Sequence, residues 1–227
     1  IKGSINNVLI NGDITADDML LATFSLDGNF SDDLNANVNG ATHRPRLKIK
    51  ATDISLLDLW ASGLSLSLRD KVTAELIDGV VDYELSGELT ELSDLAQNDL
   101  KLSLALRDVT GEVNDFWLQD LNWQQHFNYS DGDVTTDARQ NNFSLALAEV
   151  GTDITKLSAK TNIDFIQQTF SVTLNNVSGE AFGGGFSAAT VQWPFVSQEP
   201  VVMQLDSIDL AQLIALEQQQ GITVTGK

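Results

Sequence analysis

Leu100-Lys101-Leu102-Ser103-Leu104-Ala105-Leu106 alternates leucine with small or polar residues over seven consecutive positions. Side chains of a β-strand point alternately to opposite faces, so this stretch predicts a strand with one apolar and one polar side. The same alternation recurs in Leu64-Ser65-Leu66-Ser67-Leu68 and in Phe143-Ser144-Leu145-Ala146-Leu147. Because it extends through most of the chain, the apolar sides of many strands must share one continuous surface.

Short turn signals separate the alternating stretches. Asn-Gly and Asp-Gly pairs accept the positive φ angles that a two-residue β-hairpin requires. We expect hairpin turns at Asn11-Gly12, Asp27-Gly28, Asn39-Gly40, Asp78-Gly79 and Asp131-Gly132. Strands that are neighbours in the sequence are therefore expected to pair with one another.

The sequence predicts an all-β fold: a long, twisted, mostly antiparallel meander that curls into an open apolar groove. We expect residues 1–227 to form a single continuous β-groove segment, because an all-β unit of this length does not have to divide into domains. One short helix is expected near the C-terminus, over residues 209–220, with Ser207 or Asp209 as its cap. Residues 55–61 have a weaker helical spacing.

The apolar sides of the strands form the candidate site. An exposed apolar surface of more than a few hundred Å² usually marks a binding surface. We expect these side chains to line the groove: Phe24, Leu26, Leu47, Ile49, Leu64, Leu66, Leu68, Leu85, Leu100, Leu102, Leu104, Leu106, Phe143, Leu145, Leu147, Ile163, Phe165, Phe170, Val172, Leu174, Phe186, Val201, Met203 and Leu205.

The composition argues against several other functions. The net charge of -19 opposes binding to the phosphate backbone, so nucleic acid is not an expected partner. The chain has no cysteine, which excludes disulfides, thiolate metal sites and a cysteine nucleophile. The two histidines, His43 and His126, lack the spacing of a zinc site and are expected at surface or strand-end positions.

Glycine and acidic motifs provide no complete site. Gly183-Gly184-Gly185 is not followed by Lys-Ser/Thr and opens no helix, so it predicts a bend rather than a phosphate loop. Asp17-Asp18, Asp32-Asp33 and Asp131-Gly132-Asp133 lack the alternating oxygen ligands of a calcium loop. We therefore expect no catalytic residue, no metal and no cofactor, and a protein that is not an enzyme.

The C-terminal region, residues 150–227, carries a more specific order of elements. In sequence, these are the strand at Lys156-Leu157-Ser158-Ala159, the bend at Phe182-Gly183-Gly184, the strand end at Trp193-Pro194, the leucine-rich helix over residues 208–216 and the final strand over residues 221–227. This order resembles the YdbH-like proteins of the AsmA/TamB superfamily. Residues 1–149 share with them only the alternating pattern and the turn chemistry.

The resemblance implies a large periplasmic protein, anchored in the inner membrane by a helix outside this sequence, whose β-groove carries phospholipid between the inner and outer membranes. It also implies three kinds of partner: phospholipid acyl chains, a small outer-membrane lipoprotein and a periplasmic helper protein. The older family label of dicarboxylate transport has no matching cationic cluster here. We therefore expect the chain to be a segment of a longer polypeptide, with flanking strands that pair with its edges.

Two other interpretations use the same alternation. A periplasmic or extracellular β-sandwich would close the apolar sides into a core and bind carbohydrate or protein, for example through Trp60, Trp117, Trp123 or Trp193. A structural spacer would have a closed core and no ligand. Alternation alone does not distinguish a sandwich core from a groove, so the three interpretations stay open at this point.

Overall fold

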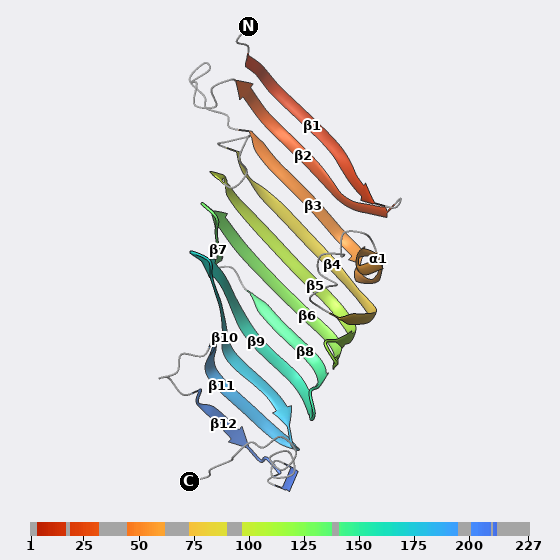
Figure 1. Cartoon of the computed structure of the whole chain (residues 1–227), viewed down its shortest axis with the longest axis vertical. Helices are drawn as coiled ribbons and strands as arrows, with labels where there is room; N and C mark the ends of the chain where they lie inside the picture. The colour runs from red at the N-terminus through yellow and green to blue at the C-terminus, as the bar shows by residue number, and fades with distance from the viewer. Residues whose placement is uncertain are drawn as a thin grey trace.

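The computed structural model describes residues 4–16, 19–31, 45–61, 73–89, 97–137, 141–194, 201–209 and 211–212. Within these ranges, twelve strands form one sheet, and they follow one another along its long axis (Figure 1). The strands are β1 (Ser4–Ala16), β2 (Met19–Ser31), β3 (Arg46–Ser55), β4 (Ala74–Glu88), β5 (Asp99–Val113), β6 (Phe116–Ser130), β7 (Asp133–Thr136), β8 (Asn142–Glu149), β9 (Asp153–Ile166), β10 (Thr169–Ala181), β11 (Gly184–Trp193) and β12 (Met203–Asp206).

Each described strand pairs antiparallel with its neighbours in the sequence, as the meander prediction requires. One deviation occurs in the middle of the sheet. β6 pairs with both β7 and β8, and β9 also pairs with both. The short strands β7 and β8 therefore share one position between β6 and β9, with a gap between them.

The turn predictions were only partly correct. Asp131-Gly132 forms the tight turn between β6 and β7, whereas Asn39-Gly40 lies outside the described residues. The other predicted turns, Asn11-Gly12, Asp27-Gly28 and Asp78-Gly79, lie inside β1, β2 and β4. Antiparallel pairing continues on both sides of all three pairs, but the register shifts next to Gly28 and on both sides of Asp78. At these two pairs an irregularity within the strand takes the place of a turn.

Three further tight turns lie outside the Asn-Gly and Asp-Gly pairs, one of them at the predicted glycine bend. Asn114-Asp115, Gln167-Gln168 and Phe182-Gly183 each have two consecutive positive φ angles. This conformation matches the twist of antiparallel strands and defines a type I′ hairpin. Asparagine, aspartate and glycine accept it readily, whereas glutamine and phenylalanine take it only because the flanking strands impose it.

The complete helix in the described residues is α1 (Leu56–Ala61), on the N-terminal side of the chain rather than near its C-terminus. It corresponds to the weaker helical stretch, and the backbone N–H of Asp58 donates to the Ser55 hydroxyl at its start. At the expected C-terminal helix, Ala211 and Gln212 are helical and the Asp209 carboxylate accepts from the backbone N–H of Ala211. Residues 213–220 lie outside the described residues.

β-Bulges interrupt the alternation at a similar level in several strands. Asp53, Asp108 and Asp120 have positive φ angles at register shifts in β3, β5 and β6. Their backbone N–H groups donate to side chains of a neighbouring strand: Asp53 to the Asp82 carboxylate, Asp108 to the Asn122 amide oxygen and Asp120 to the Thr110 hydroxyl. Each bulge thus satisfies the backbone group that it frees and bends its strand.

The described strands form a single layer. Extensive contacts between the described elements are limited to sheet neighbours and to α1 on β3 and β4. A sandwich would bring strands from distant parts of the chain face to face. The described residues therefore lack the second sheet that the sandwich interpretation requires.

Candidate functional site: the apolar face of the sheet

Residues that pair across antiparallel strands point to the same face, so the register defines the two faces of the sheet. Phe24 pairs with Ile49, Ile49 with Leu85, Leu85 with Leu102 and Leu102 with Phe127. We call the face that carries this row the apolar face, and the opposite face the polar face.

One row of the apolar face connects nine strands without interruption. It consists of Ile10, Leu26, Leu47, Gly87, Leu100, Tyr129, Val134, Phe165 and Phe170, from β1 to β10. At about 4.8 Å between neighbouring strands, its eight intervals extend roughly 38 Å. The apolar face is therefore continuous across the part of the sheet that holds most of the predicted site.

The register places most predicted groove residues together. Those that it links on the apolar face are Phe24, Leu26, Leu47, Ile49, Leu85, Leu100, Leu102, Leu104, Leu106, Phe143, Leu145, Ile163, Phe165, Phe170, Val172, Leu174, Phe186, Met203 and Leu205. Val201 is exposed and precedes β12. Leu64, Leu66 and Leu68 lie outside the described residues.

Leu147 is placed differently from the other predicted residues. It pairs with Gln119 and Thr155, and Thr155 pairs with Glu180. This is a polar row. The shift from Leu145 to Leu147 crosses the level of the bulges, where the apolar face continues instead through Ala148, which pairs with Leu118 and Ile154.

Large apolar side chains are exposed at both ends of the apolar face. Ile10 and Ile14 are exposed at the N-terminal end, and Phe170, Trp193 and Leu205 toward the C-terminal end. The rings of Phe170 and Trp193 meet edge to face with centroids 5.8 Å apart. Because the described strands form one layer, these side chains are available to an apolar ligand.

A polar seam crosses the apolar face at the gap between β7 and β8, and the sequence analysis missed it. Gln125 is fully buried, with 0% exposure, although it pairs with Leu104. Its amide oxygen accepts from the Thr161 hydroxyl at 2.6 Å, and its amide nitrogen donates to the Thr136 hydroxyl at 3.2 Å. The Trp123 indole N–H donates to Thr161 at 3.2 Å.

The seam replaces backbone pairs that the gap removes. The Thr136 hydroxyl accepts from the backbone N–H of Ile163 at 2.7 Å and donates to its carbonyl at 3.0 Å. The backbone N–H of His126 donates to the Asn141 side chain at 2.7 Å. Side chains thus close the ladder between β6 and β9, and no buried side-chain N or O atom in the described residues lacks a partner.

Replacing Thr161 by valine is expected to destabilise the protein by about 1–3 kcal/mol, because it leaves the buried Gln125 oxygen and the Trp123 N–H without their partner. The midpoint of urea unfolding, followed by circular dichroism, measures the change. Thr173→Val removes a hydroxyl from the polar face of β10 and serves as the control. Equal midpoints for the two variants would contradict a stabilising seam.

The polar face carries ion pairs across the strands. Arg46 pairs with Glu88 at 3.0 Å and Lys48 with Glu84 at 3.2 Å. At the β3 bulge, the Arg107 guanidinium contacts the carboxylates of Asp53 at 2.6 Å and Asp82 at 2.9 Å. These charged side chains lie on the polar face of β3, β4 and β5, opposite the apolar rows of the same strands.

The cluster of Arg107, Asp53 and Asp82 lowers the pKa of Asp82 and raises the pKa of Arg107. Burial favours the neutral form of Asp82, but the backbone N–H of Asp53 and the Arg107 guanidinium outweigh it and hold the Asp82 pKa below 3.8. The hydrogen bonds from Arg107 to Asp53 and Asp82 raise the pKa of Arg107. Both groups are therefore ionised over the whole physiological range.

Because the Asp82 pKa is lowered on folding, its contribution to stability is present above pH 3.8 and is lost as the pH falls through the lower, folded value. We expect Arg107→Gln to reduce the loss of stability between pH 5 and pH 3. Urea midpoints at the two pH values measure it. Lys101→Gln, a charge removal on the same strand and face, is the control; if both variants respond alike, the cluster has no specific role.

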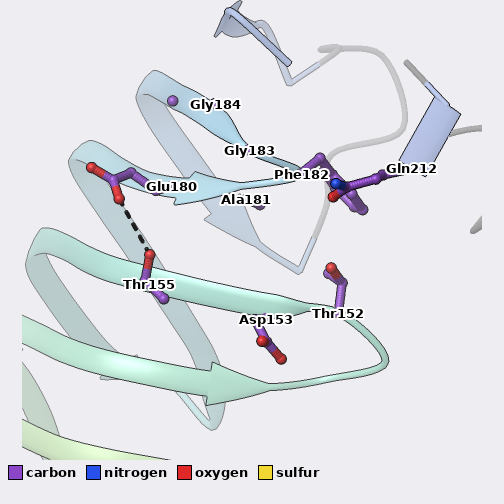
Figure 2. Close-up of a pocket in the computed structure, with 10 residues that line it drawn as sticks. Thr152, Asp153, Thr155, Glu180, Ala181, Phe182, Gly183, Gly184 and Gln212 are labelled. Atoms are coloured by element: carbon purple, nitrogen blue, oxygen red, sulfur yellow. Dashed lines mark hydrogen bonds between the residues drawn. The ribbon is translucent and has the colours of Figure 1, made fainter. Parts of the chain in front are cut away.

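Figure 2 shows the hollow beside the glycine run, between the β8–β9 connection and the β10–β11 turn. The Glu180 carboxylate there accepts from Lys156 at 2.8 Å and from Thr155 at 3.4 Å. A Cβ at Gly184 would collide with the Asp206 carbonyl oxygen, so the glycine allows close approach of β12. As predicted, the run forms a bend, and its glycine has a packing role.

Two features are absent from the described residues. No group of three or more histidine, aspartate or glutamate side chains in the described ranges is placed to hold a metal ion. Among the described helices, none has the length and apolar character that a membrane span requires.

Comparison with known proteins agrees with this geometry. The family model described as "YdbH-like: Intermembrane phospholipid transport protein YdbH" matches residues 3–227, so the likeness extends well beyond residues 150–227. Neither the curated proteins nor the solved structures give a match. The family is one of lipid transport proteins rather than enzymes, and its intermembrane role is consistent with a periplasmic location. The chain, whose described strands form one sheet with a continuous apolar face, belongs to the YdbH-like family of intermembrane phospholipid transport proteins.

Proposed function

We propose that this chain is a segment of a periplasm-spanning protein that carries phospholipid acyl chains along its apolar face between the inner and outer membranes. The row from Ile10 to Phe170 is the observation that carries the proposal. It extends roughly 38 Å, whereas one leaflet of a hydrocarbon core is about 15 Å thick. An acyl chain can therefore move along the row without returning to water.

The physical basis of the transfer is passive. Exposing a methylene group to water costs about 0.8 kcal/mol, so a whole acyl chain in water is strongly disfavoured. A continuous apolar face removes most of this cost at every position along the path. The headgroup stays in water near the rim of the sheet, and the polar face, with its ion pairs, points to solvent.

The setting of the segment is part of the proposal. The protein would be anchored in the inner membrane through a segment outside this sequence, and flanking strands would continue the sheet. A small outer-membrane lipoprotein and a periplasmic helper protein would act with it. The family membership supports this setting.

Photo-crosslinking of the complete natural polypeptide in bacterial cells tests the proposal. A photo-reactive amino acid is placed at Phe165, on the apolar face, or at Asn162, which is exposed on the polar face of the same strand. We expect phospholipid adducts at Phe165 at least tenfold above those at Asn162. Native mass spectrometry of the purified protein should show bound phospholipid.

The alternatives predict different results. A structural spacer predicts no adducts at either position and no bound lipid. A carbohydrate-binding or protein-binding module predicts bound sugar or peptide in the same mass spectra. Equal labelling of Phe165 and Asn162 would also contradict the proposal, because it would indicate contact with lipid that does not depend on the face.

A further inference from the structure

Helix α1 lies on the apolar face rather than within the sheet. Leu56 and Leu59 pack against the buried cluster formed by Ala22, Ala51, Ile54 and Val81. Ala22 is 2% exposed and Ala51 5%, whereas Phe24 and Ile49, next to them on β2 and β3, are only half-buried. Figure 1 shows α1 at the end of β3 and beside β4. The helix therefore covers one side of the apolar face at β2 to β4.

The sheet leaves space for this helix at a glycine of β4. Gly79 in β4 has a φ of 139°, and a Cβ there would lie 3.1 Å from Leu56 Cδ1 and 3.0 Å from the Cα of Val109. The absence of a side chain at Gly79 thus leaves room for Leu56, and the small residues Ala22 and Ala51 belong to the cluster on which both leucines pack. The bulge at Asp53 ends the regular part of β3 just before α1 begins.

Tyr83 strengthens the same region. Its hydroxyl donates to the backbone carbonyl of Leu21 at 3.1 Å and so connects β4 with β2 across β3. Its ring packs on the cluster beneath α1. This bond holds the three strands under the helix together and gives α1 a rigid base.

The covered area divides the apolar face of β2 to β4 into two parts. On one side lie the rows of Leu26 and Leu47 and of Phe24 and Ile49, which α1 leaves open. On the other side lies the buried cluster under α1. We infer that α1 is a side wall, which excludes lipid from Ile54 and Val81 and confines acyl chains at β2 to β4 to the Leu26 and Phe24 rows. This inference depends on the proposed function.

A phospholipid with a photoactivatable diazirine in its acyl chain tests the wall without altering the protein. The complete natural polypeptide is labelled in liposomes, and the modified residues are identified by mass spectrometry. We expect labelling at Phe24, Ile49 and Leu85 at least tenfold above labelling at Ile54 and Val81.

A variant pair tests whether α1 is the cause. Replacing Leu56 and Leu59 together by serine removes the contacts that hold the helix, so labelling should appear at Ile54 and Val81. Leu57→Ser is the matched control, because Leu57 is 40% exposed on the same helix, and its labelling map should equal that of the natural protein. If the double variant loses its β-sheet circular dichroism signal, Leu59→Ala takes its place.

The outcomes separate the inference from the proposed function. Strong labelling of Ile54 and Val81 in the natural protein would overturn the wall but leave lipid transfer intact. If the variant with serine at Leu56 and Leu59 is labelled at the same residues as the natural protein, the side wall is likewise overturned. Absence of labelling from the whole apolar face, Ile49 and Phe165 included, would overturn both.

Discussion

Phe165→Asp is expected to leave the protein folded and to reduce bound phospholipid at least tenfold. Phe165 is 38% exposed in the row that continues to Phe170, so a carboxylate at this position can stay hydrated in the lipid-free protein. An acyl chain passing it would have to remove that water, which costs several kcal/mol. Lipid that co-purifies with the complete polypeptide, quantified by mass spectrometry, measures the effect.

The same substitution at a covered position should unfold the protein. Leu145 is 4% exposed on the apolar face of β8, where it pairs with Leu157. Leu145→Asp loses apolar packing and buries an unpaired charge, which together cost about 3–5 kcal/mol or more. Circular dichroism melting curves distinguish the two variants: Phe165→Asp should show a cooperative transition, and Leu145→Asp should not.

Asn162→Asp is the control for both variants. It adds the same carboxylate to β9 on the polar face, and it should change neither stability nor bound lipid. Unfolding of Phe165→Asp would show that this part of the face is covered in the natural protein. Full lipid binding by a folded Phe165→Asp variant would show that acyl chains do not pass along the row that contains Phe165.

Gly111→Ala is expected to cost about 3 kcal/mol or more of unfolding free energy. Gly111 is buried in β5, and a Cβ there would lie 2.5 Å from the Glu75 carbonyl oxygen and 2.8 Å from the Leu76 Cα. Backbone atoms cannot move aside as a flexible side chain can, so β4 and β5 must separate. The φ of 155° adds strain for any residue with a side chain.

Gly132→Ala separates backbone strain from collision. Gly132 also has a positive φ, 86°, but a Cβ there would meet no atom within 4 Å. Its substitution should cost only about 1 kcal/mol, the strain of the turn alone. Urea midpoints of the two variants give the comparison. Equal midpoints would show that β4 and β5 do not approach each other closely at Gly111.

The face of most groove residues could be predicted from sequence because side-chain direction in a regular strand follows from position alone. Leu100, Leu102 and Leu104 share a face by the two-residue period, and the structure places them so. Leu147 instead lies in a row of polar residues, because a bulge shifts the two-residue period between Leu145 and Leu147. Which strand carries a bulge depends on its partners, and the sequence of one strand does not contain that information.

The polar seam illustrates the same limit. Gln125 is a polar residue on an alternating strand, and the pattern alone offers no reason to bury it. Its burial follows from the gap between β7 and β8, because two strands share one position there and leave backbone groups to be satisfied. Thr136 and Asn141, which lie near the gap in the sequence, were the available signal.

The alternation of apolar and polar residues was sufficient to determine strands, their two unlike faces and the all-β meander, since each depends on neighbouring positions in the chain. Whether the apolar face is covered depends on contacts between residues far apart in sequence. Tertiary structure alone decided that the described strands form one layer, that Gln125 closes the gap and that α1 lies over Ala51. The period-two pattern is identical for a closed core and an open face, because it records only which side chains point together.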